Sequence, residues 1–402
     1  RCKHLKDLKH LIYFENLLDS ANNELVRQAK EEGQLALGFT CYHMPEVLLN
    51  VDNCFSVRMR APNTGSIDVA SYYMSNYTCE YCRALVERAI EGGYNFLDGI
   101  CGVDACAQMN RCMENIELLK CIDKPNFFVT HADIPYKYTD YTLKHYVVQM
   151  QNRVLNVMHE KLGVDISDAA LREAVARHNE VCRIITEISE LRKLDNPPVT
   201  GYEFHIINMV SFCCPQKLIL PYLRETLEEI KSRELDPKPW YRCRVGIVGS
   251  EVDDPNLTRM LEDAGAFIAF DRFCFGVFPG REVIELNDEE PALVQICRHY
   301  LITSECPRFM SDEKIFQRRE TADRLAREFK ADGIIYEQMK YCDYWGFERA
   351  LVSYIMHEEY NWPVLSIDRL YNNGNSGQLR TRVQAFVESL EIKRIQKNGG
   401  TK

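Results

Sequence analysis

Five cysteines lie within one short stretch, from Cys79 to Cys112, and cysteine thiolates are the side chains that hold zinc and iron–sulfur groups. Cys79 and Cys82 open a helical pattern that stops at two glycines, and residues 94–100 then form an apolar run typical of a buried strand. Cys106 follows that strand. Ligands of open α/β sheets bind beyond the carboxyl ends of the strands. The stretch therefore predicts a metal site whose missing ligands come from elsewhere in the chain.

The segment before this stretch carries the first α/β signal. The sequence LALGFTCYHMPEVLL predicts a strand over residues 35–40 and a helix entered at Pro45. Cys41 and His43 fall in the turn between them. Residues 1–34 are predicted to form an N-terminal helical segment, with Leu5, Leu8, Leu11 and Ile12 on one apolar face.

Two further regions complete the predicted architecture. A long helical run with Ser167 as its N-cap ends at Pro197 and Pro198, which we take as the hinge between domains 35–198 and 199–402. Apolar runs predict further strands at residues 126–135, 244–248, 266–271, 333–337 and 364–367. The expected fold class is α/β, with two Rossmann-like or flavodoxin-like parallel-sheet domains and a site in the cleft between them.

Composition excludes several classes of function. A chain of 402 residues is long enough for two cores, and its net charge of −10 has no basic cluster that would favour a nucleic-acid partner. Without an apolar run of about 18 residues, we expect no membrane span and a cytoplasmic protein. Seventeen cysteines in such a chain favour metal binding over disulfides. No phosphate-binding loop of the GxxxxGK[ST] or GxGxxG type is found, so we expect no nucleotide site of its own.

The second domain offers a matching thiol. Cys342 follows the predicted strand at 333–337, so three thiolates from two domains could hold a [4Fe–4S] cluster whose fourth iron keeps an open position. Two alternatives remain: zinc at the Cys79–Cys82 pair, although no second CxxC exists, and thiols that only fill the core. Core filling is the role we expect of Cys213 and Cys214.

Four segments resemble the 2-hydroxyacyl-CoA dehydratase and benzoyl-CoA reductase family of activator-dependent iron–sulfur proteins. They are GFTCYHMPEVLL, YTCEYCRALVERAIEGGYNFLDGICGVDAC, DGIIYEQMKYCDYWGFE and GQLRTRVQAFVESL. The resemblance implies Cys79, Cys106 and Cys342 as cluster ligands, with Cys82 as a rival for the first position. Ala107 follows Cys106 where the family often has aspartate, which puts a contact around the ligand in doubt.

The resemblance also implies a reaction. A separate ATP-hydrolysing iron–sulfur activator would deliver an electron that reaches a CoA thioester and forms a ketyl radical anion, which expels a hydroxyl group or is reduced further. The working unit would be a homodimer or a heterodimer with a homologous subunit. Gln378 and Arg382 would line the cleft; the alternative is that Arg382 and Glu388 form a solvated helix face. His43 would reach the substrate or serve only the structure.

Two alternatives to this function stay open. Some relatives hold an [8Fe–9S] double cubane and reduce small molecules, which needs about six thiolates. The spare cysteines for such a cofactor are Cys41, Cys82, Cys101, Cys112, Cys121 and Cys274. The other alternative is a non-catalytic partner subunit without a cluster.

Overall fold

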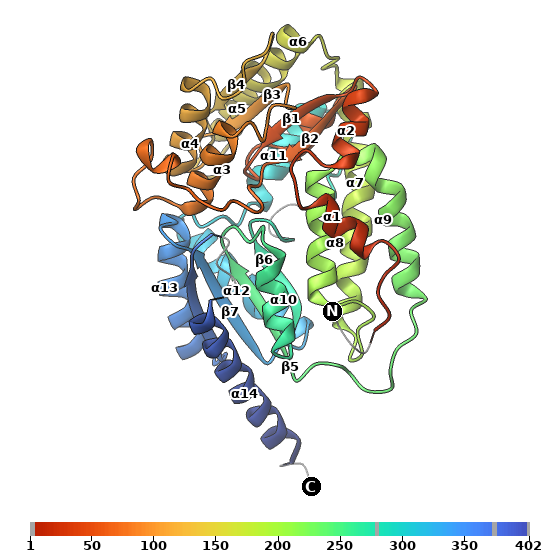
Figure 1. Cartoon of the computed structure of the whole chain (residues 1–402), viewed down its shortest axis with the longest axis vertical. Helices are drawn as coiled ribbons and strands as arrows, with labels where there is room; N and C mark the ends of the chain where they lie inside the picture. The colour runs from red at the N-terminus through yellow and green to blue at the C-terminus, as the bar shows by residue number, and fades with distance from the viewer. Residues whose placement is uncertain (1–4, 278–280, 372–375, 400–402) are drawn as a thin grey trace.

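The computed structural model describes residues 5–277, 281–371 and 376–399. Those residues form two separate four-stranded sheets in which every strand pairing is parallel. Figure 1 shows the sheet built by the first part of the chain above the sheet built by the second, with long helices beside both. The predicted α/β class with parallel sheets is therefore confirmed.

The first sheet has the strand order β2-β1-β3-β4. Every residue of β2 and β3 is buried, as expected for parallel strands covered by helices on both faces. Its strands are β1 (Leu35–Phe39), β2 (Cys54–Arg58), β3 (Gly99–Val103) and β4 (Phe128–Ala132). The helical segments around it are η1 (Glu46–Asn50), η2 (Ala70–Tyr72), α3 (Glu80–Ile90), α4 (Ala107–Leu118), α5 (Asp140–Gln149), η3 (Met150–Leu155) and α6 (Asn156–Leu162).

The second sheet repeats this topology in the order β6-β5-β7-β8. Its strands are β5 (Cys243–Gly249), β6 (Ala266–Phe273), β7 (Gly333–Met339) and β8 (Val364–Arg369). The helices of this part are α10 (Pro255–Asp263), α12 (Asp312–Glu328), α13 (Asp343–Glu358) and α14 (Gly377–Gly399). In both sheets the order reverses beside the first strand, so the crevices where such folds bind ligands lie between β1 and β3 and between β5 and β7.

A helix that is buried on all sides connects the two sheets. Every residue of α8 (Gly201–Cys213) is buried, and the helix packs against the edge strands β2 and β6. An apolar helix without a solvent-facing stripe must be surrounded by other elements, which is its position here. The helices α1 (Leu11–Leu17), α7 (Asp168–Glu190) and α9 (Gln216–Lys231) contact it, as does α10. The remaining helical segments are α2 (Glu24–Glu31), η4 (Leu191–Lys193) and α11 (Ala292–Thr303).

Most predicted elements are present at shifted boundaries. Ser167 caps α7, since its side chain accepts a hydrogen bond from the Ala170 N–H. The predicted strand at 94–100 is wrong for its first five residues, which form turns before β3 starts at Gly99. A short apolar run reports burial and cannot by itself distinguish a strand from a packed turn.

Two other predictions need correction. The helix predicted after Pro45 is only the short 3-10 segment η1. Ile12 is predicted on the buried face of the N-terminal segment, but its side chain is 51% exposed.

Cys213 and Cys214 are buried in the core, as predicted. Across the three described ranges, no helix combines the length and the apolar character that a membrane crossing requires.

Candidate metal centre between the two sheets

A cavity of about 130 Å³ lies where the carboxyl ends of the two sheets meet. Its walls come from the segments that follow β1, β2, β3, β5, β6 and β7 and from the loop between α11 and α12, so both crevices open into one shared space. The lining is mainly apolar, yet it contains an unusual number of thiols. They are Cys41, Cys79, Cys82, Cys106, Cys274, Cys306 and Cys342.

Three of these thiols occupy helix N-termini. Cys79, Cys106 and Cys342 are the N-cap residues of α3, α4 and α13. The Cys106 sulfur accepts the Met109 N–H at 3.4 Å. Unpaired N–H groups and the helix dipole stabilise negative charge at such positions. The three residues that the family resemblance implied as ligands therefore share one electrostatic environment, which suits thiolates and an anionic inorganic group.

The other four thiols extend the sulfur-lined surface. Cys82 lies in the first turn of α3, Cys41 follows β1 after one residue, and Cys274 directly follows β6. Cys306 lies in the loop between α11 and α12. Its sequence context, TSECPRF, has no strand before it, so the rule that ligands follow strands gave no signal for it.

Protonation differs among the thiols. The Cys82 thiol donates a hydrogen bond to the Cys79 sulfur, which lowers the pKa of Cys79 below its usual value. Burial raises the pKa of Cys106 to about 12 and that of Cys41 to about 11, and it also raises the pKa of Cys342 and Cys274. Without a metal to replace the protons, Cys79 is thus the thiol most readily ionised.

A buried ion pair completes one wall. The Arg58 Nη2 and Glu251 Oε1 atoms lie 3.3 Å apart, and the Arg58 guanidinium lies 4.3 Å from the Phe275 ring centre. Burial raises the pKa of Glu251 to about 7, against the opposing effect of Arg58. Sequence patterns did not single out either residue, although Glu251 lies in a loop after a predicted strand and the same strand-end rule applies to it. Arg58 ends β2, a strand that was not predicted.

His43 lines the same cavity, on the Cys41 side. Its Nδ1 lies 3.4 Å from the Cys41 sulfur and its Nε2 lies 2.9 Å from Ser304 Oγ. Burial lowers the pKa of His43 well below its usual value, so the imidazole is neutral.

The remaining predicted residues lie elsewhere. Gln378 and Arg382 are exposed at the start of α14, where Arg382 donates a hydrogen bond to the Ser366 carbonyl at 2.6 Å. Neither is part of the described cavity wall. The spare cysteines Cys101, Cys112 and Cys121 also lie outside it, Cys101 and Cys112 as core residues.

The donor set distinguishes between kinds of metal group. Among the described residues, no three His, Cys, Asp or Glu side chains are close enough together to hold a single metal ion such as zinc. A cluster makes a different demand, because each thiolate binds a different iron and the sulfurs stand apart around a shared inorganic core. Seven thiols in an apolar cavity, three of them at helix N-termini, fit an iron–sulfur group.

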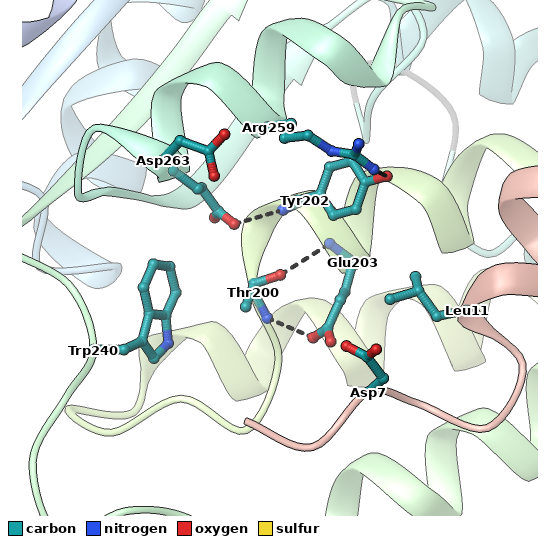
Figure 2. A pocket seen from close by; sticks show the side chains of 9 residues that line it. Asp7, Leu11, Thr200, Tyr202, Glu203, Trp240, Arg259 and Asp263 are labelled. Atoms are coloured by element: carbon teal, nitrogen blue, oxygen red, sulfur yellow. Dashed lines mark hydrogen bonds between the residues drawn. The ribbon is translucent and has the colours of Figure 1, made fainter. Parts of the chain in front are cut away.

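A smaller pocket beside the N-terminus of α8 lacks such a donor set (Figure 2). Figure 2 shows the reciprocal capping box in which the Thr200 hydroxyl accepts the Glu203 N–H and the Glu203 carboxylate accepts the Thr200 N–H. Glu262 adds a second cap, since its carboxylate accepts the N–H groups of Gly201 and Tyr202 at 2.6 and 3.1 Å. These carboxylates satisfy the helix terminus, so this pocket has a structural explanation.

Comparison with known proteins gives a consistent set of relatives. The sequence profile described as 2-hydroxyglutaryl-CoA dehydratase, D-component, matches residues 41–390. The beta subunit of (R)-phenyllactyl-CoA dehydratase from Clostridium sporogenes is 22% identical over 377 residues, covering 94% of this chain and 97% of that one. A subunit of benzoyl-CoA reductase from Thauera aromatica is 22% identical, with coverages of 80% and 81%. The beta subunit of (R)-2-hydroxyglutaryl-CoA dehydratase from Acidaminococcus fermentans is also 22% identical, with coverages of 91% and 95%.

Proposed function

This chain belongs to the 2-hydroxyglutaryl-CoA dehydratase D-component family, and from that premise we propose that it is the iron–sulfur subunit of an ATP-activator-dependent enzyme that acts on a CoA thioester. The chain is an enzyme of the 2-hydroxyacyl-CoA dehydratase type. Its reaction is either the dehydration of a 2-hydroxyacyl-CoA or a reduction of the benzoyl-CoA type, since relatives of both kinds match most of its length.

The observation that carries this proposal is the convergence of thiols from both halves of the chain on one cavity. Cys79, Cys106 and Cys342 would hold a [4Fe–4S] cluster, each from the N-terminus of its own helix. When bound, such a cluster supplies a low-potential electron and an iron with an open position for the substrate. Helix N-termini stabilise the negative charge that the thiolates and the substrate bring.

The other wall residues prepare the space for a reactive substrate. The mainly apolar lining offers water few hydrogen-bond partners, which would limit side reactions of a radical with water. Glu251 fixes the Arg58 guanidinium, whose buried positive charge would face an anionic group in the cavity. Because the His43 imidazole is neutral, it can donate one hydrogen bond and accept another in the cavity without adding a charge.

The partners follow from the same premise. The chain has no phosphate-binding loop motif, so ATP hydrolysis belongs to a separate activator. The relatives are themselves named as subunits, which supports assembly with a homologous subunit, either a second copy or a sister chain.

One observation favours a second candidate function. Three thiolates suffice for one [4Fe–4S] cluster, but the cavity wall carries seven thiols. The four beyond the first set are Cys41, Cys82, Cys274 and Cys306. Seven thiols would also supply the roughly six thiolates of an [8Fe–9S] double cubane. The chain would then reduce a small molecule with electrons from the same kind of activator.

Iron and acid-labile sulfide counts on anaerobically purified and reconstituted protein separate these functions. About four irons per chain support the single cluster, and about eight support the double cubane. With eight irons, Cys274→Ser and Cys306→Ser would each lower the iron content, whereas a single cluster held by Cys79, Cys106 and Cys342 would be unaffected by them. A chain that binds no iron would be a non-catalytic partner subunit, and the proposed function would be wrong.

A further inference from the structure

Gln108 makes hydrogen bonds to both halves of the cavity wall. It is the second residue of α4 and comes two positions after Cys106. Its Oε1 accepts the N–H of Cys79, the N-cap of α3. Its Nε2 donates to the Tyr341 carbonyl at 2.7 Å and to the Asp343 carboxylate at 3.2 Å.

The partners of Gln108 lie at Cys79 and on either side of Cys342. Tyr341 and Asp343 are the residues on either side of Cys342, the N-cap of α13. The Gln108 side chain therefore contacts the backbone of Cys79 and both neighbours of Cys342. Gln108 itself comes two residues after Cys106. The helices α3 and α4 belong to the β1–β4 half of the chain, and α13 belongs to the β5–β8 half.

The uncharged Gln108 amide acts here through the geometry of its hydrogen bonds. A primary amide has separate donor and acceptor ends, so it can link an N–H on one side to a carbonyl on the other, which a carboxylate cannot do. Proteins hold metal ligands in place through contacts of this kind around the ligands themselves. Gln108 has the chemistry required to join the α3 terminus to the α13 terminus.

We propose that Gln108 is a positioning residue that fixes the spacing of Cys79 and Cys106 relative to Cys342 across the junction of the two halves, and so sets the geometry in which a shared cluster is held. This inference rests on the proposed function, because it assigns a role toward the same cluster. It concerns a residue that touches the ligands and does not itself bind iron.

The chain supplies a matched control in Gln338. Its Nε2 donates to the Cys342 carbonyl at 3.1 Å and its Oε1 accepts from Arg349 at 2.8 Å, so it supports the same loop from within the β5–β8 half alone. Like Gln108, it is partly exposed. Gln338→Ala removes a glutamine next to Cys342 without removing a link between the halves.

The experiment compares the full-length wild type with Gln108→Ala, Gln108→Glu and Gln338→Ala after anaerobic reconstitution. It measures the rate at which a chelator removes iron and the electron paramagnetic resonance spectrum of the reduced protein. Hydrogen exchange of the peptides that contain Cys79 and residues 340–346 is measured on the same proteins without iron.

We expect Gln108→Ala to release iron about tenfold faster than the wild type, because it loses its hydrogen bonds to both halves, and to show an altered spectrum. Gln108→Glu retains an acceptor for the Cys79 N–H, so the Cys79 peptide should exchange as in the wild type. It cannot donate to the Tyr341 carbonyl, and Asp343 repels it, so iron should again be released rapidly. Gln338→Ala loses contacts within the β5–β8 half only. Its Cys79 peptide should therefore exchange as in the wild type, and its iron release should rise less than that of Gln108→Ala.

Two results would overturn the inference. One is wild-type iron release and spectrum in Gln108→Ala, and the other is unchanged exchange of both peptides in that variant. A wild type that binds no iron at all would instead defeat the proposed function, whereas the exchange data would still decide whether Gln108 links the two halves.

Discussion

At the scale of the residue, the role of each cysteine depends on its place in the fold. Cys106 and Cys112 are six residues apart on or next to α4, yet the first lines the cavity and the second packs in the core. Burial raises the pKa of both thiols, so composition and burial do not separate a ligand from a core residue. The separating feature is position, because Cys106 is the N-cap of α4 just beyond the end of β3, whereas Cys112 lies inside α4.

This contrast leads to a first prediction on ligands. Cys106→Ser and Cys342→Ser should each lower bound iron by at least about tenfold, because a hydroxyl is a poor substitute for a thiolate on iron. Their free energies of unfolding without iron should stay within about 1 kcal/mol of the wild type. Iron analysis and urea denaturation measure the two quantities. Cys112→Ala is the control and should retain its iron, and full iron retention in either serine variant would refute the ligand assignment.

The lowered pKa of Cys79 leads to a second prediction. In the iron-free protein, iodoacetamide at pH 8 should alkylate Cys79 before Cys106, whose pKa of about 12 keeps it protonated. The rate at Cys79 should rise with pH until its lowered pKa is passed and then level off. Mass spectrometry of the peptides follows both reactions.

Cys82→Ala tests the cause of that reactivity. Without the hydrogen bond from Cys82 the pKa of Cys79 should rise, and alkylation at pH 8 should slow. Equal alkylation rates at Cys79 and Cys106 in the wild type would contradict the account.

The sequence alone could identify part of this site. Cys41, Cys106, Cys274 and Cys342 each follow a predicted strand, so their convergence follows from the topology of parallel sheets. Cys306 follows a helix and reaches the cavity only because α11 packs on the first half of the chain before α12 returns to the second. Such a tertiary route leaves no local signal.

At the scale of the element, the site depends on helix starts and strand ends. Three helices begin at cavity thiols, and α8 keeps the edge strands of both sheets in place. Sequence patterns predicted the N-cap of α7 correctly, because capping depends only on a serine and the first helical turn that follows it. They failed at residues 94–98, where Tyr94 is buried in a turn and its hydroxyl donates to the Arg60 carbonyl.

The N-terminus of α8 gives an element-scale prediction. Thr200→Ala removes the hydroxyl that accepts the Glu203 N–H in a buried capping box, so it should lower the free energy of unfolding by about 1 kcal/mol. Urea denaturation of the iron-free protein measures the loss. Thr200→Ser retains the hydroxyl and should recover most of the stability, while equal stability of the alanine variant and the wild type would show that the cap contributes nothing.

At the scale of the whole molecule, two sheets of the same strand order face one cavity with their carboxyl ends. The two-sheet architecture could be predicted from alternating strand and helix patterns. The shared cavity could not, because its wall combines residues as distant as Cys41 and Cys342, and only packing around α8 and α11 decides how the two sheets meet. The central claim is therefore that thiols from both sheets hold one group.

The most direct measurement of that claim is an anomalous-difference map at the iron absorption edge, from crystals of the reconstituted protein grown without oxygen. The account predicts iron peaks inside the cavity, with bonds to the sulfurs of Cys79 and Cys106 on one side and of Cys342 on the other. Peaks bound only by cysteines of one half, or a cavity without iron in a protein that carries iron elsewhere, would contradict it.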